Sequence, residues 1–363
     1  KFFILNIFTI NASMYTLKIP KVILIYEKIM LVIIKELKKI LSKEKKIIIT
    51  THTNPDGDAV GSSLALYHFL KKMNHNVNVI TPNKHPDFLN WIPGCNEIII
   101  FDENVERANK LIADSDIVFT LDFNDLNRCG LVGEAINLKK HEIIMIDHHQ
   151  SPSDYSNITF SYPDISSTCE LIFKIITQIS DDDLIDRDIS TCIYLGMMTD
   201  TGSFQYNGVN SETHSILSSL MKKGIDHSKI YNNIYNSNNL SKLRILGSAL
   251  NSLNQIKEKK TTYMRLSKNQ LIENNYKKGD TEGLVNYGLS LKNIDFTAIF
   301  IEDIEEMDNV KISFRSKNIF PCDKFAKKFF NGGGHKNAAG GKYTGTIDAV
   351  SYTHLRAHET GYN

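Results

Sequence analysis

Short apolar runs alternate with helical segments over residues 30–215 of this chain. The clearest runs are DIVFTLDF at 116–123 and EIIMID at 142–147, which are continuously apolar, as in strands buried on both faces of a parallel sheet. Further strands are expected at Lys45–Thr51, Val77–Thr81 and Glu97–Phe101, and helices at Gly61–Lys72, Thr168–Gln178 and Asp188–Met198. This order predicts an α/β fold, a doubly wound and largely parallel sheet, over residues 30–215.

The remainder of the chain has a different pattern. Residues 216–258 are polar and rich in asparagine, and we interpret them as a helical connector. Strands expected at Thr261–Leu266, Asp295–Glu302 and Val310–Arg315 are then followed by a glycine cluster. These features predict a smaller α+β domain over residues 259–346, with an active-site cleft between the two domains.

The two ends differ from the sequence between them. Residues 1–29 carry no clear period, whereas Met30 begins an amphipathic segment with apolar residues at helical spacing: Leu31, Ile33, Ile34, Leu37, Ile40 and Leu41. We therefore interpret residues 1–29 as a non-native leader. Residues 347–363 are interpreted as an artefactual tail, because their last thirteen residues resemble a translated cloning sequence.

Composition excludes several classes of protein. The 42 Lys and Arg residues balance 41 Asp and Glu residues, which argues against a protein that binds long nucleic acid through bulk charge. The five cysteines are odd in number and form no C-x-x-C pair, so they indicate free thiols and a cytoplasmic location. No apolar run approaches the roughly 18 residues that a membrane span requires.

Acidic and imidazole side chains follow four of the predicted elements. Ligands in an open parallel sheet bind outside the carboxyl ends of the strands. The first strand is followed by His52, Asp56 and Asp58, and DIVFTLDF contains Asp122 near its end. EIIMID ends at Asp147, which precedes His148 and His149, and Asp200 lies where a predicted helix gives way to a glycine-containing loop.

So many carboxylates in one crevice would repel one another unless a cation neutralised them. The motifs supply more ligands than one divalent ion needs, whereas two ions bridged by carboxylates would use all of them. These candidate ligands are His52, Asp56, Asp58, Asp122, His148 and Asp200. The mixture of imidazole and carboxylate favours Mn²⁺ over Mg²⁺, and Zn²⁺ or Co²⁺ would also fit. The pattern therefore predicts two divalent cations and phosphoryl-transfer chemistry.

Each of these motifs also has a purely structural interpretation. Asn54-Pro55-Asp56-Gly57 is typical of a turn, and Asp58 or Asp122 could cap a helix. A pair of histidines after a strand could pack against backbone. The joint occurrence of all four elements favours the metal site, because chance would have to place such groups at four separate positions.

The order of these motifs along the chain resembles that of the DHH phosphoesterase superfamily. The order is His-x3-Asp-x-Asp, then Asp at a strand end, then Asp-His-His, and finally Asp before Gly. The segment Phe330–Gly340 (FNGGGHKNAAG) resembles the Gly-Gly-Gly-His signature of the DHH-associated domain. The resemblance covers nearly all of residues 30–346. The length and the segment Gly279–Asn286 (GDTEGLVN) are most similar to the nanoRNase branch, which combines oligoribonuclease and pAp (3′-phosphoadenosine 5′-phosphate) phosphatase activities.

The resemblance also implies roles for individual residues. One metal ion would take His52, Asp56, Asp122 and Asp200, and the other Asp58, Asp122, His148 and Asp200, so that Asp122 and Asp200 bridge the two ions. His149 would either support the metal ligands from outside their shell or donate a proton near the leaving group, and Asp147 would orient the two histidines.

A basic run in the second domain suits a phosphate-rich substrate. Residues 311–342 contain eight Lys or Arg and one acid, a local charge of +7, although a solvated basic face is the more common reason for such a run. Gly332, Gly333 and Gly334 would let backbone amides approach a phosphate, with His335 adding a donor. Arg315, at the end of a predicted strand, could bind a phosphate bidentately, and the resemblance likewise assigns Arg315 and His335 to substrate phosphate.

We therefore expect a metal-dependent phosphoesterase that hydrolyses short oligoribonucleotides to mononucleotides and removes the 3′-phosphate of pAp. A phosphodiesterase for linear or cyclic dinucleotides is an alternative. A non-catalytic RNA-binding module is a second alternative, which would be indicated by a missing ligand, and none is missing. The resemblance also favours a homodimer.

Overall fold

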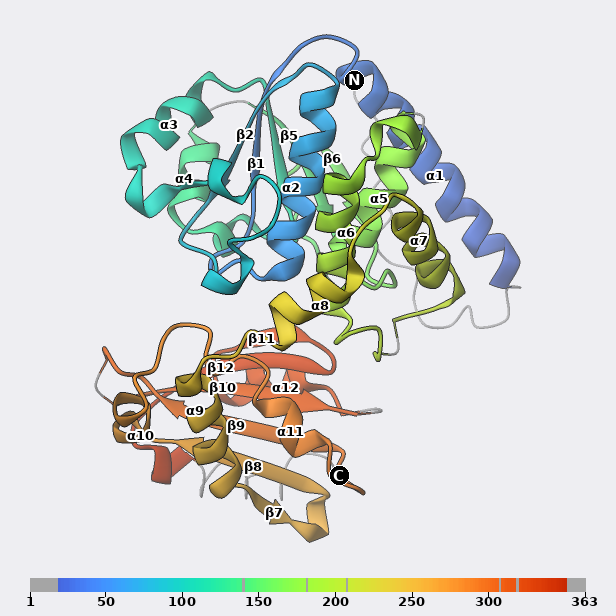
Figure 1. Ribbon diagram of the computed structural model, residues 1–363. Coiled ribbons are helices and arrows are strands. Elements are labelled where there is room, and N and C mark those ends of the chain that lie inside the picture. Colours follow the sequence, from blue (N-terminus) through green and yellow to red (C-terminus); the bar gives the residue numbers. More distant parts are fainter. Residues whose placement is uncertain are drawn as a thin grey trace. The chain divides into compact units, whose positions relative to one another are not determined.

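The computed structural model describes residues 19–350, apart from 139–140, 181, 207, 307 and 318–319. The chain divides into two compact units between Ile230 and Tyr231 (Figure 1). Residues 1–18 of the expected leader, and the expected tail from residue 351 onward, lie outside the described residues.

The first unit contains a six-stranded parallel sheet in the order β3-β2-β1-β4-β5-β6. Its strands are β1 (Lys46–Thr50), β2 (Asn76–Thr81), β3 (Ile99–Ile100), β4 (Ile117–Leu121), β5 (Glu142–Asp147) and β6 (Ile158–Ser161). The order reverses between β1 and β4, as in doubly wound folds. The predicted fold class is confirmed. The strand expected at Glu97–Phe101 is reduced to two residues because short 3₁₀ turns flank it, and β6 was not predicted.

Helices cover both faces of this sheet (Figure 1). Helices α3 and α4 lie on one face, and α2, α5 and α6 lie on the other. The helices of this unit are α1 (Ile19–Ile40), α2 (Gly57–Lys72), α3 (Val105–Asp114), α4 (Leu131–Asn137), α5 (Thr168–Ile179), α6 (Arg187–Asp200) and α7 (Ser211–Lys222), followed by α8 (His227–Tyr235) across the division. Every residue of β4 is buried, as its continuous apolar run predicts.

Helix α1 begins at Ile19, upstream of the start expected at Met30. Ile34, Leu37 and Leu41 are buried, which confirms the helical period of this segment. Leu31, expected on the same apolar face, is 46 % exposed. No helix among the described residues is long and apolar enough to cross a membrane.

Two glycines allow α2 and α6 to pack closely beside the sheet. A Cβ atom on Gly61 of α2 would lie 2.6 Å from the carbonyl oxygen of Cys192 in α6, and one on Gly196 of α6 would lie 2.8 Å from Oδ1 of Asp58 in α2. Real Cβ atoms do not approach other atoms so closely, so these positions require glycine. The packing matters for the site because α2 carries Asp58 and α6 ends at Asp200.

We expect Gly61→Ala to lower the free energy of unfolding by about 1–3 kcal/mol, because the added methyl group overpacks the contact between α2 and α6. Gly247→Ala in α9 (Leu240–Asn251) is a matched control, since a Cβ atom there meets nothing within 4 Å. The control should gain about 0.5–1 kcal/mol from helix propensity. Denaturant unfolding of both variants measures the difference, and equal stabilities would contradict the packing argument.

The second unit has its own six-stranded sheet, in the order β11-β12-β10-β9-β8-β7. Only β8 and β9 pair in parallel among the described strands of this sheet, and the other neighbours are antiparallel. The strands are β7 (Asn254–Ile256), β8 (Thr261–Leu266), β9 (Phe296–Glu302), β10 (Asn309–Ser316), β11 (Gly333–His335) and β12 (Ala338–Thr344). Helices α9, α10 (Lys268–Glu273), α11 (Val285–Leu289) and α12 (Cys322–Phe329) complete the α+β architecture that the sequence predicts.

Separate apolar clusters pack around this sheet. Alternate residues of β9 and β10 pack with α12, and another cluster joins β8 to α9, α10 and α11. Ile347 and Val350 are buried in the cluster with α12, so the core extends beyond the boundary expected at residue 346. Helix α9 also belongs to a core rather than to a separate connector, because Ile245 and Ala249 are buried against β8.

Candidate metal centre

The carboxyl ends of β1, β4 and β5 meet at one edge of the parallel sheet. β1 and β4 are the neighbours between which the strand order reverses, and a ligand crevice is expected there. His52 follows β1, Asp122 follows β4 directly, and Asp147 is the last residue of β5. Asp56 and Asp58 lie at the start of α2, which begins just after β1.

His52 and His148 are held with one ring nitrogen turned toward the carboxylates. Nδ1 of His52 lies 2.8 Å from the Thr53 carbonyl oxygen, and Nδ1 of His148 lies 3.3 Å from that of Ile165. A carbonyl oxygen can only accept, so Nδ1 of each ring carries hydrogen and donates. The Nε2 atoms therefore face the carboxylates, the orientation that metal-ligating histidines require.

Asp122 lies between these two histidines. Its Oδ2 is 3.5 Å from Nε2 of His52, and its Oδ1 is 3.6 Å from Nε2 of His148. The residue is 2 % exposed, and its backbone is left-handed, with φ of 65°. Left-handed backbone is uncommon for any residue except glycine and marks a position that the surrounding structure holds in place.

Asp58 is bound by the first turn of α5. Its Oδ2 accepts from the backbone N–H of Thr168 at 2.6 Å, and its Oδ1 from that of Cys169 at 2.9 Å. The hydroxyl of Thr168 also donates to Oδ1 of Asp122 at 2.9 Å. Thr168 was not identified from the sequence. The one sequence pattern at this position is Ser167-x-x-Glu170, which predicts the start of a helix. This pattern gives no information about hydrogen bonds to residues far away in the sequence.

The remaining predicted residues also approach this cluster. Asp56 caps α2 by accepting from the N–H groups of Asp58 and Ala59, so the capping interpretation applies to Asp56 rather than to Asp58. Oδ2 of Asp200, at the end of α6, lies 3.4 Å from Nε2 of His148. His149 donates from Nδ1 to Oδ1 of Asp147 at 2.7 Å.

Among the described residues, three sets have ligand atoms within 4.8 Å of one another: His52, Asp56 and Asp122; Asp58, His148 and Asp200; and Asp122, His148 and His149. Asp122 belongs to two of these sets, whereas Asp200 belongs to one. The oxygen and nitrogen donors, the inward-facing Nε2 atoms and the spacing all fit divalent cations.

The electrostatics of the cluster also fit a cation. Burial opposes the charged form of His52, but the hydrogen bond to Asp122 and the charges of Asp56 and Asp122 raise its pKa to about 9. For His148, burial is likewise outweighed by the charges of Asp200, Asp122 and Asp58, and the pKa rises to about 9. Burial and the charge of Asp122 raise the pKa of both Asp58 and Asp200. Without metal, protons therefore neutralise the cluster in part.

The residues predicted to bind phosphate lie in the second sheet. Arg315 of β10 and His335 of β11 both pair with Ala338 of β12, so strand register brings them into one row. The glycine run differs from expectation, since Gly333–His335 is a strand rather than a loop. A Cβ atom on Gly332 or Gly334 would clash with the backbone of β12, so close strand pairing alone requires glycine at both positions.

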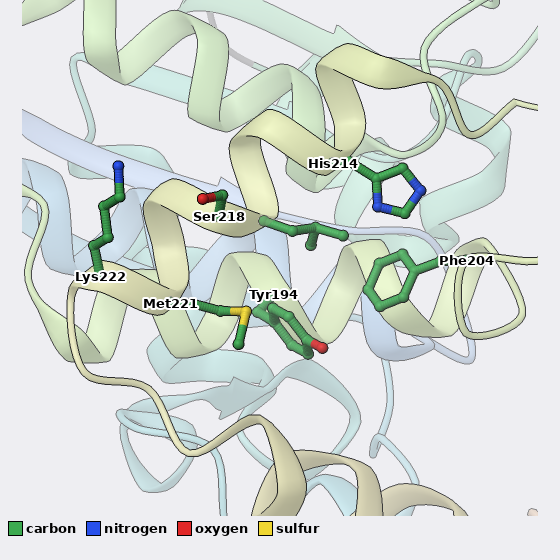
Figure 2. Close-up of a pocket in the computed structure, with 7 residues that line it drawn as sticks. Tyr194, Phe204, His214, Ser218, Met221 and Lys222 are labelled. Atoms are coloured by element: carbon green, nitrogen blue, oxygen red, sulfur yellow. The ribbon is translucent and has the colours of Figure 1, made fainter.

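A hollow of about 550 Å³ occurs elsewhere in the first unit (Figure 2). Tyr194 and Phe204, whose rings meet edge to face at 5.6 Å, line it together with side chains of α7: His214, Leu217, Ser218, Met221 and Lys222. It shares no lining residue with the histidine and carboxylate cluster.

Comparison with known proteins agrees with this architecture. Residues 46–197 match the N-terminal domain of the DHH family, and residues 245–351 match the DHHA1 domain. A crystal structure of an exopolyphosphatase-related protein from Bacteroides fragilis is 43% identical and superposes with a TM-score of 0.87, covering 90% of this chain and 96% of that one. The chain belongs to the DHH family. It carries both the DHH and the DHHA1 domain of these phosphoesterases.

Two further relatives extend the comparison. The bifunctional oligoribonuclease and PAP phosphatase NrnA of Thermus thermophilus is 26% identical over 302 residues, which cover 83% of this chain and 85% of the relative. The structure of RecJ from Thermus thermophilus in complex with Mn²⁺ is 12% identical with a TM-score of 0.50, covering 90% of this chain and 53% of RecJ. At that identity, the likeness to RecJ shows a shared fold.

Proposed function

We propose that this DHH protein hydrolyses short oligoribonucleotides to mononucleotides and removes the 3′-phosphate of pAp, with two divalent cations, most favourably Mn²⁺, as cofactors. The observation that carries the proposal is the cluster at the sheet edge, in which the two oxygens of Asp122 face His52 and His148. The similarity to a named oligoribonuclease and PAP phosphatase supports the substrate class. The mixture of imidazole and carboxylate ligands supports the choice of Mn²⁺.

The ligand sets suggest how the cations would be held. His52, Asp56 and Asp122 would hold one ion, and Asp58, His148 and Asp200 the other, with Asp122 shared between them. Cations bound there would lower the pKa of water and neutralise charge on the reacting phosphate. Asp200, whose Oδ2 lies 3.4 Å from Nε2 of His148, would bridge as well.

The chain's own residues would perform the remaining tasks. His149, oriented by the acceptor Asp147, would supply a proton to the leaving oxygen. Arg315 and His335, which both pair with Ala338 of β12, would bind the phosphates of the substrate. In the glycine run, Gly333 would leave room for a phosphate, because a Cβ atom there would meet nothing within 4 Å.

A substrate panel tests this proposal. Purified protein with Mn²⁺ would be given pAp, a diribonucleotide, a five-residue RNA, a cyclic dinucleotide, pyrophosphate and inorganic polyphosphate. We expect mononucleotides from the two RNAs and AMP from pAp. If only the cyclic dinucleotide or only polyphosphate is hydrolysed, the proposed substrates are wrong. If the protein binds RNA but hydrolyses no compound of the panel, it is a binding module and not an enzyme.

We expect Arg315→Ala to raise KM for pAp and short RNA about ten- to a hundredfold, because a charged hydrogen bond to phosphate contributes roughly 1.5–3 kcal/mol. Metal content should not change, since Arg315 lies in the second unit and the ligand cluster in the first. Arg265→Ala is a matched control, because Arg265 is an arginine of the same sheet that pairs with Asp348 at 2.7 Å. An unchanged KM in Arg315→Ala would remove this residue from the binding site.

A further inference from the structure

Thr168 is the residue through which three segments of the first unit meet. It is fully buried at the first position of α5, directly after the helix cap Ser167. Its backbone N–H donates to Asp58 of α2, and its hydroxyl donates to Asp122 at the end of β4. These partners are 110 and 46 residues away in the sequence.

From these bonds we infer that Thr168 is a positioning residue, whose hydroxyl fixes the Asp122 carboxylate so that its two oxygens serve different cations. The inference rests on the metal-dependent function proposed above. The bonded oxygen, Oδ1, is the one that lies 3.6 Å from Nε2 of His148, whereas Oδ2 faces His52. An aspartate carboxylate can turn about its terminal bond, and a single donor to one oxygen restricts that rotation.

The helix that carries Thr168 is itself held firmly. Glu170, two residues further along α5 and 1 % exposed, accepts from the hydroxyls of Ser166 and of Thr213 in α7. The N–H of Cys169 adds a second bond to Asp58. Since backbone groups and a buried carboxylate fix this turn, the threonine hydroxyl has a defined position from which to orient Asp122.

The variant that isolates the hydroxyl is Thr168→Val, which keeps the shape of the side chain and removes the donor. We expect it to weaken binding of Mn²⁺ about ten- to a hundredfold and to lower kcat by a similar factor, as loss of an outer partner of a metal ligand typically does. KM should stay within about twofold, because Thr168 makes its contacts to ligands rather than to substrate. Thr168→Ser restores the donor and should recover most of the lost affinity.

Titration calorimetry of Mn²⁺ into the metal-free full chain measures this effect independently of activity. Thr177→Val makes the same substitution on the same helix, where the hydroxyl donates to the backbone carbonyls of Phe173 and Lys174, and it should bind Mn²⁺ as the unmodified chain does. Thr168→Ala removes the donor without adding a methyl group, and it supplies the comparison if the valine variant does not fold.

Equal Mn²⁺ affinity in the unmodified chain and in both donor-free variants would overturn the inference while leaving the proposed function intact. Equal losses in Thr168→Ser and Thr168→Val would also overturn it, because the hydroxyl would not then be the cause. If the unmodified chain binds Mn²⁺ and hydrolyses no nucleotide, the proposed function is wrong, and the comparison of affinities still decides the role of Thr168.

Discussion

Replacing Asp122 with alanine is expected to lower phosphoesterase activity at least about a hundredfold on every substrate that the protein hydrolyses. The reason is the shared position of this carboxylate, whose two oxygens lie 3.5 and 3.6 Å from Nε2 of His52 and of His148. Without it, the two cations would lose a carboxylate that lies between them, so their mutual repulsion would rise and each would lose a ligand. The measurement is kcat/KM for pAp and for a diribonucleotide, together with bound metal per chain.

Two companion variants separate the carboxylate from the backbone. Asp122 has φ of 65°, where asparagine is well tolerated and alanine is strained, so Asp122→Asn should lose activity with less effect on stability. Asp308→Ala is the matched control, because Asp308 also has a left-handed backbone, with φ of 54°, but lies exposed in the second unit. Retention of most activity by Asp122→Asn would rule out a shared carboxylate at this position.

The sequence predicted the cluster because strand ends follow simple rules. Continuous apolar runs identify buried parallel strands, and the carboxyl ends of such strands meet at one edge. β5 therefore ends at Asp147 as expected, and the residue after β4 is Asp122. The close approach of α2 and α6 brings Asp58 and Asp200 to the same His148.

Thr168 was missed because its role depends on contacts across long sequence separations. A threonine after a helix cap has an ordinary local explanation, and no spacing rule connects it to Asp58 or Asp122. The left-handed backbone of Asp122 was missed for a similar reason, since aspartate at a strand end has no residue-level signal for positive φ.

The second sheet was predicted only in part because its edge has weak strand signals. β12 contains two adjacent glycines, Gly340 and Gly341, which lower strand propensity, and β11 is three residues long. Their pairing with each other and with β10 supplies the stability that the local sequence lacks. The glycine run therefore looked like a phosphate-binding loop, although two of its glycines are required by the approach of β12.

Removing divalent metal with excess chelator should abolish activity on all substrates, and added Mn²⁺ should restore it. In the metal-free protein, neighbouring carboxylates raise the pKa values of His52 and His148 to about 9, so both imidazoles are largely protonated at pH 7. A cation needs the unprotonated Nε2 atom of each ring, so Mn²⁺ binding must displace these protons.

The sign of the pH dependence follows from this competition. Raising the pH from 6.5 toward 9 removes the competing protons, so the affinity for Mn²⁺ should rise by up to about tenfold per pH unit for each proton displaced. The dependence should flatten above pH 9, where both rings are neutral before metal arrives. Calorimetry in buffers of different ionisation enthalpy measures the protons released. An affinity for Mn²⁺ that is constant from pH 6.5 to 9, with no proton release, would show that His52 and His148 are not ligands of the metal. Activity that survives the chelator would show that the reaction does not depend on a divalent metal.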